Sequence, residues 1–203
     1  MFDFRFLVNL GITFGFFGFW HVVLYILGWS ERPFMPNRRY KVDKVAHNMW
    51  YTLLGVVQYT VWEAIFVHCC ATKKIPFMTD NQALSSTWNL TMFILAAFWV
   101  PLYREFHFYF AHRFIHIKAM YKYIHSLHHR NTDIEPFAGL CMHPVEHLYY
   151  YSSIGPSLIL FTTPFAFLWN GVHLLASIAF SLLCSKTCKL LNLFIPCYLL
   201  NVF

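Results

Sequence analysis

Histidine is the residue in this sequence with the clearest capacity for chemistry, and its distribution is uneven. Eight of the twelve histidines lie between residues 104 and 147. Seven of these form an H-x3-H cluster, an H-x2-H-H cluster and a second H-x3-H cluster: His112 and His116; His125, His128 and His129; His143 and His147. Residues three or four apart share one face of a helix, so each cluster can direct its imidazoles to a common point.

Seven clustered imidazoles predict a metal centre. Neutral imidazole binds iron, zinc and copper. Seven ligands are more than one tetrahedral zinc ion uses, so two metal ions are indicated. His107 precedes His112 by five residues and lies off its helix face. We therefore expect it to support the ligands, with Glu105 and Glu146 as acceptors for ring N–H groups. The isolated histidines, His21, His47, His68 and His173, are predicted to be structural.

The rest of the chain predicts membrane helices that would position these clusters. Hydrophobic residues make up 58% of the sequence and charged residues 12%, about half the charged share of soluble domains. The apolar residues form four runs, at 4–29, 50–70, 88–103 and 152–184, most of which approach the roughly 20 residues that cross a bilayer. We expect an all-α, polytopic membrane bundle. Residues 1–103 would hold the N-terminal spans and residues 104–203 the histidine region and a membrane hairpin, in one integrated domain.

Two positions within the runs leave alternatives open. Thr162-Thr163-Pro164 interrupts the last run, and proline breaks a helix. This favours a hairpin of two short helices, although a single tilted span would also fit. Glu63 lies inside the second run, where a carboxylate is either functional or faces a polar cavity.

The basic residues indicate how the spans are oriented. The formal net charge is +6, and basic residues are concentrated between the first two runs and after the third. The positive-inside rule places both regions, and hence the histidine clusters, on the cytoplasmic side and residues 71–87 in the lumen. The sequence shows no basic surface interleaved with aromatic residues, so it does not predict nucleic-acid binding.

The histidine clusters and their flanking residues also resemble a known family. The segments are His112-Arg113-x-x-His116, Tyr121-Lys122-Tyr123-Ile124-His125-x-x-His128-His129 and Gly139-Leu140-Cys141-Met142-His143-Pro144-Val145-Glu146-His147. They are similar to the fatty acid hydroxylase/sterol desaturase superfamily of integral membrane enzymes over roughly residues 98–179. The resemblance implies two iron ions that activate O2 for hydroxylation or desaturation of a lipid, such as a sterol or fatty acyl chain. It also implies an endoplasmic reticulum location and a cytochrome b5-type electron donor.

The sequence departs from that family at one motif. Family members carry a further H-x2-H-H box after the last membrane hairpin, whereas no histidine follows His173 here. The departure predicts an incomplete second metal site, with about one metal bound and no lipid oxidised by this chain alone. The alternatives are therefore a lipid oxygenase and an inactive relative that binds lipid or regulates a partner. A zinc- or copper-handling membrane protein is a third alternative, which only the histidines support.

Overall fold

The structure is a computed structural model that describes residues 2–27, 42–75, 79–131 and 135–153, together with the isolated positions 155, 172 and 176. Every regular element in these residues is helical, which confirms the predicted all-α class. The loop 28–41, most of the predicted hairpin 152–184 and the cysteines and leucines of the C-terminal tail lie outside the described residues.

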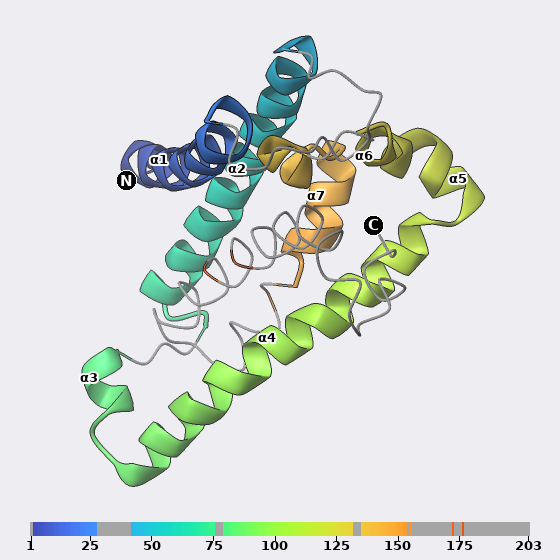
Figure 1. Ribbon diagram of the computed structural model, residues 1–203. Coiled ribbons are helices and arrows are strands. Elements are labelled where there is room, and N and C mark those ends of the chain that lie inside the picture. The colour runs from blue at the N-terminus through green and yellow to red at the C-terminus, as the bar shows by residue number, and fades with distance from the viewer. Residues whose placement is uncertain are drawn as a thin grey trace, which may run out of the picture.

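The first two predicted spans are continuous helices. α1 covers Phe2–His21 and is extended by the π-helical turn η1, Val22–Ile26, whereas α2 covers Val42–Ala71. Both are long and apolar enough to cross a membrane, with mean hydropathies of 1.7 and 1.4. Figure 1 shows α1 packed beside α2 at an angle to it, and the two helices contact each other.

The interface between α1 and α2 combines apolar and polar contacts. Phe17 of α1 and Val45 of α2 belong to one buried cluster with Phe137 and Leu140. Near the start of α1 and the end of α2, Glu63 pairs with Arg5 and accepts a 2.7 Å hydrogen bond from Asn9. Glu63 therefore faces polar partners on α1, which accounts for a carboxylate inside an apolar run.

The third apolar run lies within a longer helix. α4 extends over Thr87–Ile115, after the short helix α3, Asp80–Ala83. Ser86 caps α4 by accepting a hydrogen bond from the Asn89 N–H, and the helix continues past Pro101. At residue 117 the backbone becomes extended, with φ −60° and ψ 136°, and the chain turns away from the axis of α4.

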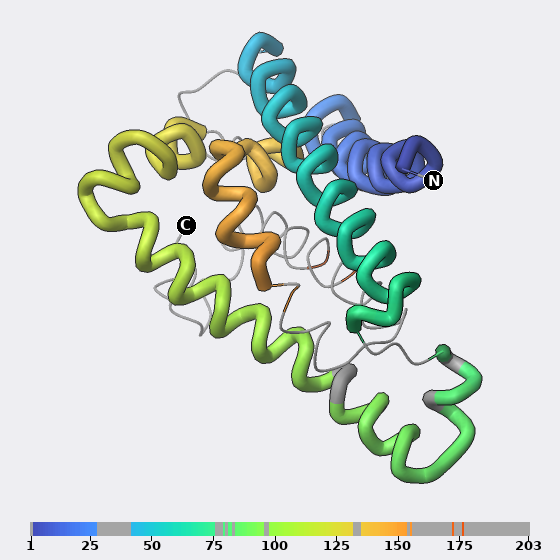
Figure 2. The backbone as a smooth tube through the Cα atoms, turned by 180° about the vertical axis from the view of Figure 1, so that it is seen from behind, coloured from blue at the N-terminus to red at the C-terminus, as the bar shows by residue number. Residues whose placement is uncertain are grey.

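Short elements follow α4 and carry or border the clustered histidines that come after His116. They are α5, Lys118–Met120; the π-helical turn η2, Tyr121–His125; α6, Ser126–His129; the 3₁₀ turn η3, Pro136–Leu140; and α7, Pro144–Tyr151. Figures 1 and 2 show α7 between α2 and α4, and it contacts both. The C-terminal end of α4 and the N-terminal half of α2 thus lie on the same side of the molecule as the short elements.

Candidate metal centre

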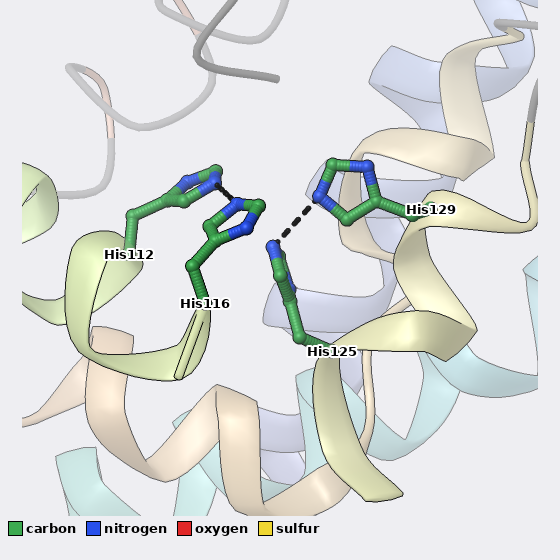
Figure 3. Close-up of side chains that lie close together, drawn as sticks. All are labelled: His112, His116, His125 and His129. Carbon is green, nitrogen blue, oxygen red and sulfur yellow. Dashed lines mark hydrogen bonds between the residues drawn. The ribbon is translucent and has the colours of Figure 1, made fainter. Parts of the chain in front are cut away.

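Four of the predicted ligands converge on one point. His112 and His116 project from the end of α4, His125 from the end of η2 and His129 from the end of α6. One ring nitrogen from each lies within 4.8 Å of the corresponding nitrogens of the other three. Figure 3 shows the two rings from α4 facing the two rings from the following turns.

The ring nitrogens within each pair lie at hydrogen-bond distance. The Nε2 atoms of His112 and His116 are 2.8 Å apart, as are those of His125 and His129 (Figure 3). A metal ion holds imidazole nitrogens at about 2.0–2.1 Å, which brings neighbouring ligands to about 3 Å and opposite ligands to about 4 Å. The spacing of these nitrogens is therefore close to that of nitrogens that share one ion.

The electrostatic environment keeps these rings in the form that binds metals. Burial lowers the pKa of His112 to about 3 and the pKa values of His125 and His129 to about 4. Burial also lowers the pKa of His116, although this side chain is largely exposed. Neutral imidazoles have a lone pair to donate, so the cluster fits a first-row transition metal.

Glu146 orients one of the four rings. Its Oε1 atom lies 2.8 Å from Nδ1 of His125, and both side chains are fully buried. A hydrogen on Nδ1 leaves the Nε2 lone pair of His125 available inside the cluster, the arrangement typical of metal-binding histidines. Burial raises the pKa of Glu146 to about 8, and a cation in the cluster would oppose that shift by favouring the carboxylate.

His128 and His147 lie outside the four-histidine cluster, and backbone carbonyls orient both. Nδ1 of His128 donates to the Cys141 carbonyl at 3.2 Å, and Nε2 of His147 donates to the Leu140 carbonyl at 3.1 Å. A carbonyl only accepts, so the opposite ring nitrogen keeps its lone pair in each neutral ring. Nδ1 of His147 is buried and has no hydrogen-bond partner among the described residues, as expected of a nitrogen reserved for a ligand.

His143 has a different local role. It is the N-cap of α7, and its Nδ1 accepts a 3.2 Å hydrogen bond from the Val145 N–H. With Nδ1 accepting, the neutral ring carries its hydrogen on Nε2 and has no second lone pair for a metal. Metal binding by His143 would therefore need a different ring orientation, and its role as a ligand stays a prediction.

The predicted supporting residues differ in their placement. Glu146 contacts the cluster through His125, as described above. His107 instead lies 3.1 Å from the Ser152 hydroxyl, between α4 and the end of α7, and Glu105 lies near it on α4. Of the histidines predicted to be structural, His21 lies 3.4 Å from Glu135 and His47 lies 3.9 Å from the Cys141 sulfur. His68 is in the last turn of α2, and His173 lies outside the described residues.

Three residues near the site were missed by reasoning from the sequence. Glu135 and Asn48 form a buried hydrogen bond across 87 positions of the chain, and Gly55 lies against the ring of His147. No local pattern marks any of them, since their partners are distant in the sequence. The only available signal was Asn48, a polar residue near the start of the largely apolar helix α2.

Comparisons with known proteins identify the family of the chain. The model of the family described as fatty acid hydroxylase matches residues 94–197, which include all seven clustered histidines. A Delta(7)-sterol-C5(6)-desaturase from Nicotiana tabacum is 39% identical over 89 residues, which cover 39% of this chain and 32% of that protein. A Delta(7)-sterol 5(6)-desaturase from Gibberella zeae is 42% identical over 45 residues, covering 22% of this chain and 13% of that protein.

A longer match is to a different kind of enzyme. A very-long-chain aldehyde decarbonylase from Oryza sativa is 26% identical over 148 residues, covering 69% of this chain and 54% of that protein. The chain spans no more than about half the length of the curated relatives it matches. No solved structure matches the chain. Because the family match extends over half of the sequence and contains the convergent histidines, the chain belongs to the fatty acid hydroxylase family.

Proposed function

We propose that the four-histidine cluster binds iron and that the chain takes part in O2-dependent oxidation of a membrane lipid. The observation that carries the proposal is the convergence of His112, His116, His125 and His129 within 4.8 Å. Iron supplies the activation of O2 when it is bound. The names of the matched desaturases support a sterol or a fatty acyl chain as the lipid.

The protein's own residues would hold the metal and shape access to it. The ends of α4, η2 and α6 fix the four rings, and Glu146 sets the orientation of His125. His112 and His125 are buried, whereas His116 is exposed. The cluster therefore combines a dry interior with an opening on one side, which suits a site that excludes bulk water and still admits a substrate.

An apolar groove along α4 also suits a lipid ligand. The groove has a volume of about 590 Å³ and lies on a face of α4 that is turned away from His112, since about 100° per residue places its lining positions opposite that histidine, and Tyr149 of α7 also lines it. It is lined by Tyr103, Phe106, His107, Phe110, Ala111, Phe114 and Tyr149. Such a surface favours a hydrocarbon chain over a polar substrate.

The resemblance adds partners and a second metal to this proposal. His128, His143 and His147 are the candidates for a second iron ion, and a cytochrome b5-type protein is the expected electron donor. We also propose an endoplasmic reticulum membrane location with the histidine clusters on the cytoplasmic side. The two apolar helices α1 and α2 support the membrane location.

One observation favours a second candidate function. Within the described residues, only four of the seven clustered histidines converge, which is enough for one metal ion. A chain with a single metal would lack the two-metal chemistry that the resemblance implies. The second candidate is therefore an inactive relative that keeps the fold and one metal and acts as a lipid-binding or regulatory membrane protein.

Product analysis separates the two candidates. The full chain is expressed with a cytochrome b5 donor in cells supplied with sterols and fatty acids, and the lipids are compared with those from His125→Ala cells. A hydroxylated or desaturated product that disappears in the variant supports the oxygenase. Bound metal without any new product supports the inactive relative, and neither metal nor product contradicts both.

A further inference from the structure

Glu135 is a buried carboxylate that joins three parts of the chain. It is 4% exposed and lies directly before η3. Its Oε1 atom accepts a 2.8 Å hydrogen bond from Asn48 of α2, and its Oε2 atom accepts a 3.1 Å hydrogen bond from the Phe137 N–H. His21, at the end of α1, lies 3.4 Å from the same Oε2 atom. One side chain thus connects η3 to both membrane helices.

Further contacts hold the same segment against α2. Thr52, one helical turn after Asn48, donates to the Phe137 carbonyl at 3.1 Å. Just beyond the segment, Gln58 donates to the carbonyl of Pro144, the first residue of α7, at 3.1 Å. Phe137 packs against Phe14 and Phe17 of α1, with ring centroids 5.5 and 5.7 Å apart. Segment 135–141 is therefore fixed by polar contacts on α2 and apolar contacts on α1.

The C-terminal end of this segment contacts two of the clustered histidines. The Leu140 carbonyl accepts from His147, and the Cys141 carbonyl accepts from His128. Each carbonyl determines which ring nitrogen carries the hydrogen and which keeps its lone pair. The two histidines come from different elements, so the consecutive carbonyls also fix the position of α6 relative to α7.

α2 limits the position of His147 from the opposite side. A Cβ atom at Gly55 would lie 2.8 Å from Cε1 and 2.9 Å from Nε2 of His147, and 3.2 Å from the Tyr151 hydroxyl. The two distances to His147 are shorter than real contacts of a Cβ atom allow, and the third is tighter than most. The ring of His147 is stacked on Tyr151, with centroids 5.5 Å apart and an interplanar angle of 6°. It is therefore held between α2, Tyr151 and the Leu140 carbonyl.

We propose that Glu135 is a positioning residue, which fixes segment 135–141 against α1 and α2 so that its last two carbonyls orient His128 and His147. The inference deepens the proposed function and rests on it, since it explains how these two rings are prepared for a metal. It also predicts that the membrane helices are coupled to the site through one carboxylate, although neither helix carries a clustered histidine.

The first test reads the histidine tautomers of the metal-free protein. Nitrogen-15 NMR of histidine-labelled full-length protein in detergent reports which ring nitrogen carries hydrogen. We expect Nδ1–H for His128 and Nε2–H for His147 in the wild type, and mixed tautomers for both in Glu135→Ala. Glu135→Gln keeps an oxygen acceptor and should preserve most of the wild-type signal. Gly55→Ala should alter His147 and leave His128 unchanged.

The second test measures metal affinity by chelator competition with Fe(II) or Co(II). Supporting residues typically contribute 10–100-fold to metal affinity, and we expect Glu135→Ala to lose about tenfold in affinity for the metal that His128 and His147 would bind. The matched control is Glu63→Ala, which removes another buried carboxylate between α1 and α2 that contacts neither segment 135–141 nor the clustered histidines. Its metal affinity and tautomers should equal those of the wild type, even if it unfolds at a lower temperature.

The outcomes distinguish this inference from the proposed function. If the wild type binds no metal, the proposed metal site is wrong, and the tautomer measurement still decides the role of Glu135. If the wild type binds metal while Glu135→Ala and Glu63→Ala behave alike in both measurements, Glu135 is only structural and the inference is wrong. If Glu135→Ala does not fold, Thr52→Val removes one contact of the same segment and must show a smaller change in the same direction.

Discussion

His125 is the best-connected residue of the cluster, because both of its ring nitrogens have close partners. Its Nδ1 atom faces Glu146 and its Nε2 atom faces His129, each at 2.8 Å. Its ring is also 4.7 Å from the ring of His116. Because these contacts already restrict its ring, His125 loses little additional side-chain conformational entropy when it binds an ion. It should therefore contribute strongly to metal affinity.

The first residue-scale prediction concerns Glu146. Glu146→Ala removes the acceptor of the His125 Nδ1 hydrogen and should weaken metal binding about 10–100-fold. Glu146→Gln keeps an oxygen but loses the charge, so its effect should be smaller. Chelator competition on the purified variants measures both effects. Unchanged affinity in Glu146→Ala would show that this carboxylate does not orient the ligand.

The sequence predicted some of these residues better than others, for local reasons. His112 with His116, and His125 with His129, are four apart on helical turns, so their side chains converge as the spacing indicates. His128 is one position from His129 and is rotated about 100° around the helix, which directs it towards Cys141 instead. His143 precedes Pro144, which begins α7, so it has extended backbone (φ −63°, ψ 143°) and does not share a helix face with His147.

At the scale of elements, α2 serves as the support on which the site is assembled. Its polar residues Asn48 and Thr52 face segment 135–141, and Gly55 makes room for His147. Near its other end Glu63 faces α1. The helix thus uses its few polar and small positions for contacts between elements, and its remaining surface is largely apolar, as a membrane requires.

The pair of Arg5 and Glu63 gives an element-scale prediction. Arg5→Met or Glu63→Leu alone leaves one charged partner in an apolar region and should cost roughly 1–3 kcal/mol of unfolding free energy. The double variant should recover part of that loss because no unpaired charge remains. Thermal unfolding in detergent provides the double-mutant cycle. Additive losses would show that the two side chains do not interact.

The helices extend beyond the apolar runs from which they were predicted. The second run begins at residue 50, whereas α2 begins at Val42, and the third run ends at residue 103, whereas α4 ends at Ile115. An apolar run marks the thickness of the hydrocarbon layer, whereas backbone hydrogen bonding continues through polar residues outside it. The contacts of Asn48 and the histidines of α4 both lie in these extensions, so hydropathy alone could not place them.

At the scale of the whole molecule, the predicted orientation in the membrane can be tested directly. The N-terminal end of α2 and the short elements with the histidines lie on one side, and the C-terminal end of α2 lies on the other (Figure 1). In a cysteine-free background, Asp43→Cys and Lys122→Cys should be labelled from the cytoplasmic side of microsomes. Lys74→Cys should be labelled only after the membrane is opened. Labelling of Asp43→Cys and Lys122→Cys from opposite sides would overturn the proposed topology.

The central claim is that four histidines from α4 and the turns after it form one metal site. Metal analysis of the purified full chain, loaded with Fe(II) without oxygen, tests it most directly. We predict at least one tightly bound iron per chain, lost in His112→Ala and His125→Ala and retained in the control His68→Ala, whose histidine lies in the last turn of α2. A wild-type protein without bound metal, or bound iron that survives both cluster substitutions, would contradict the account.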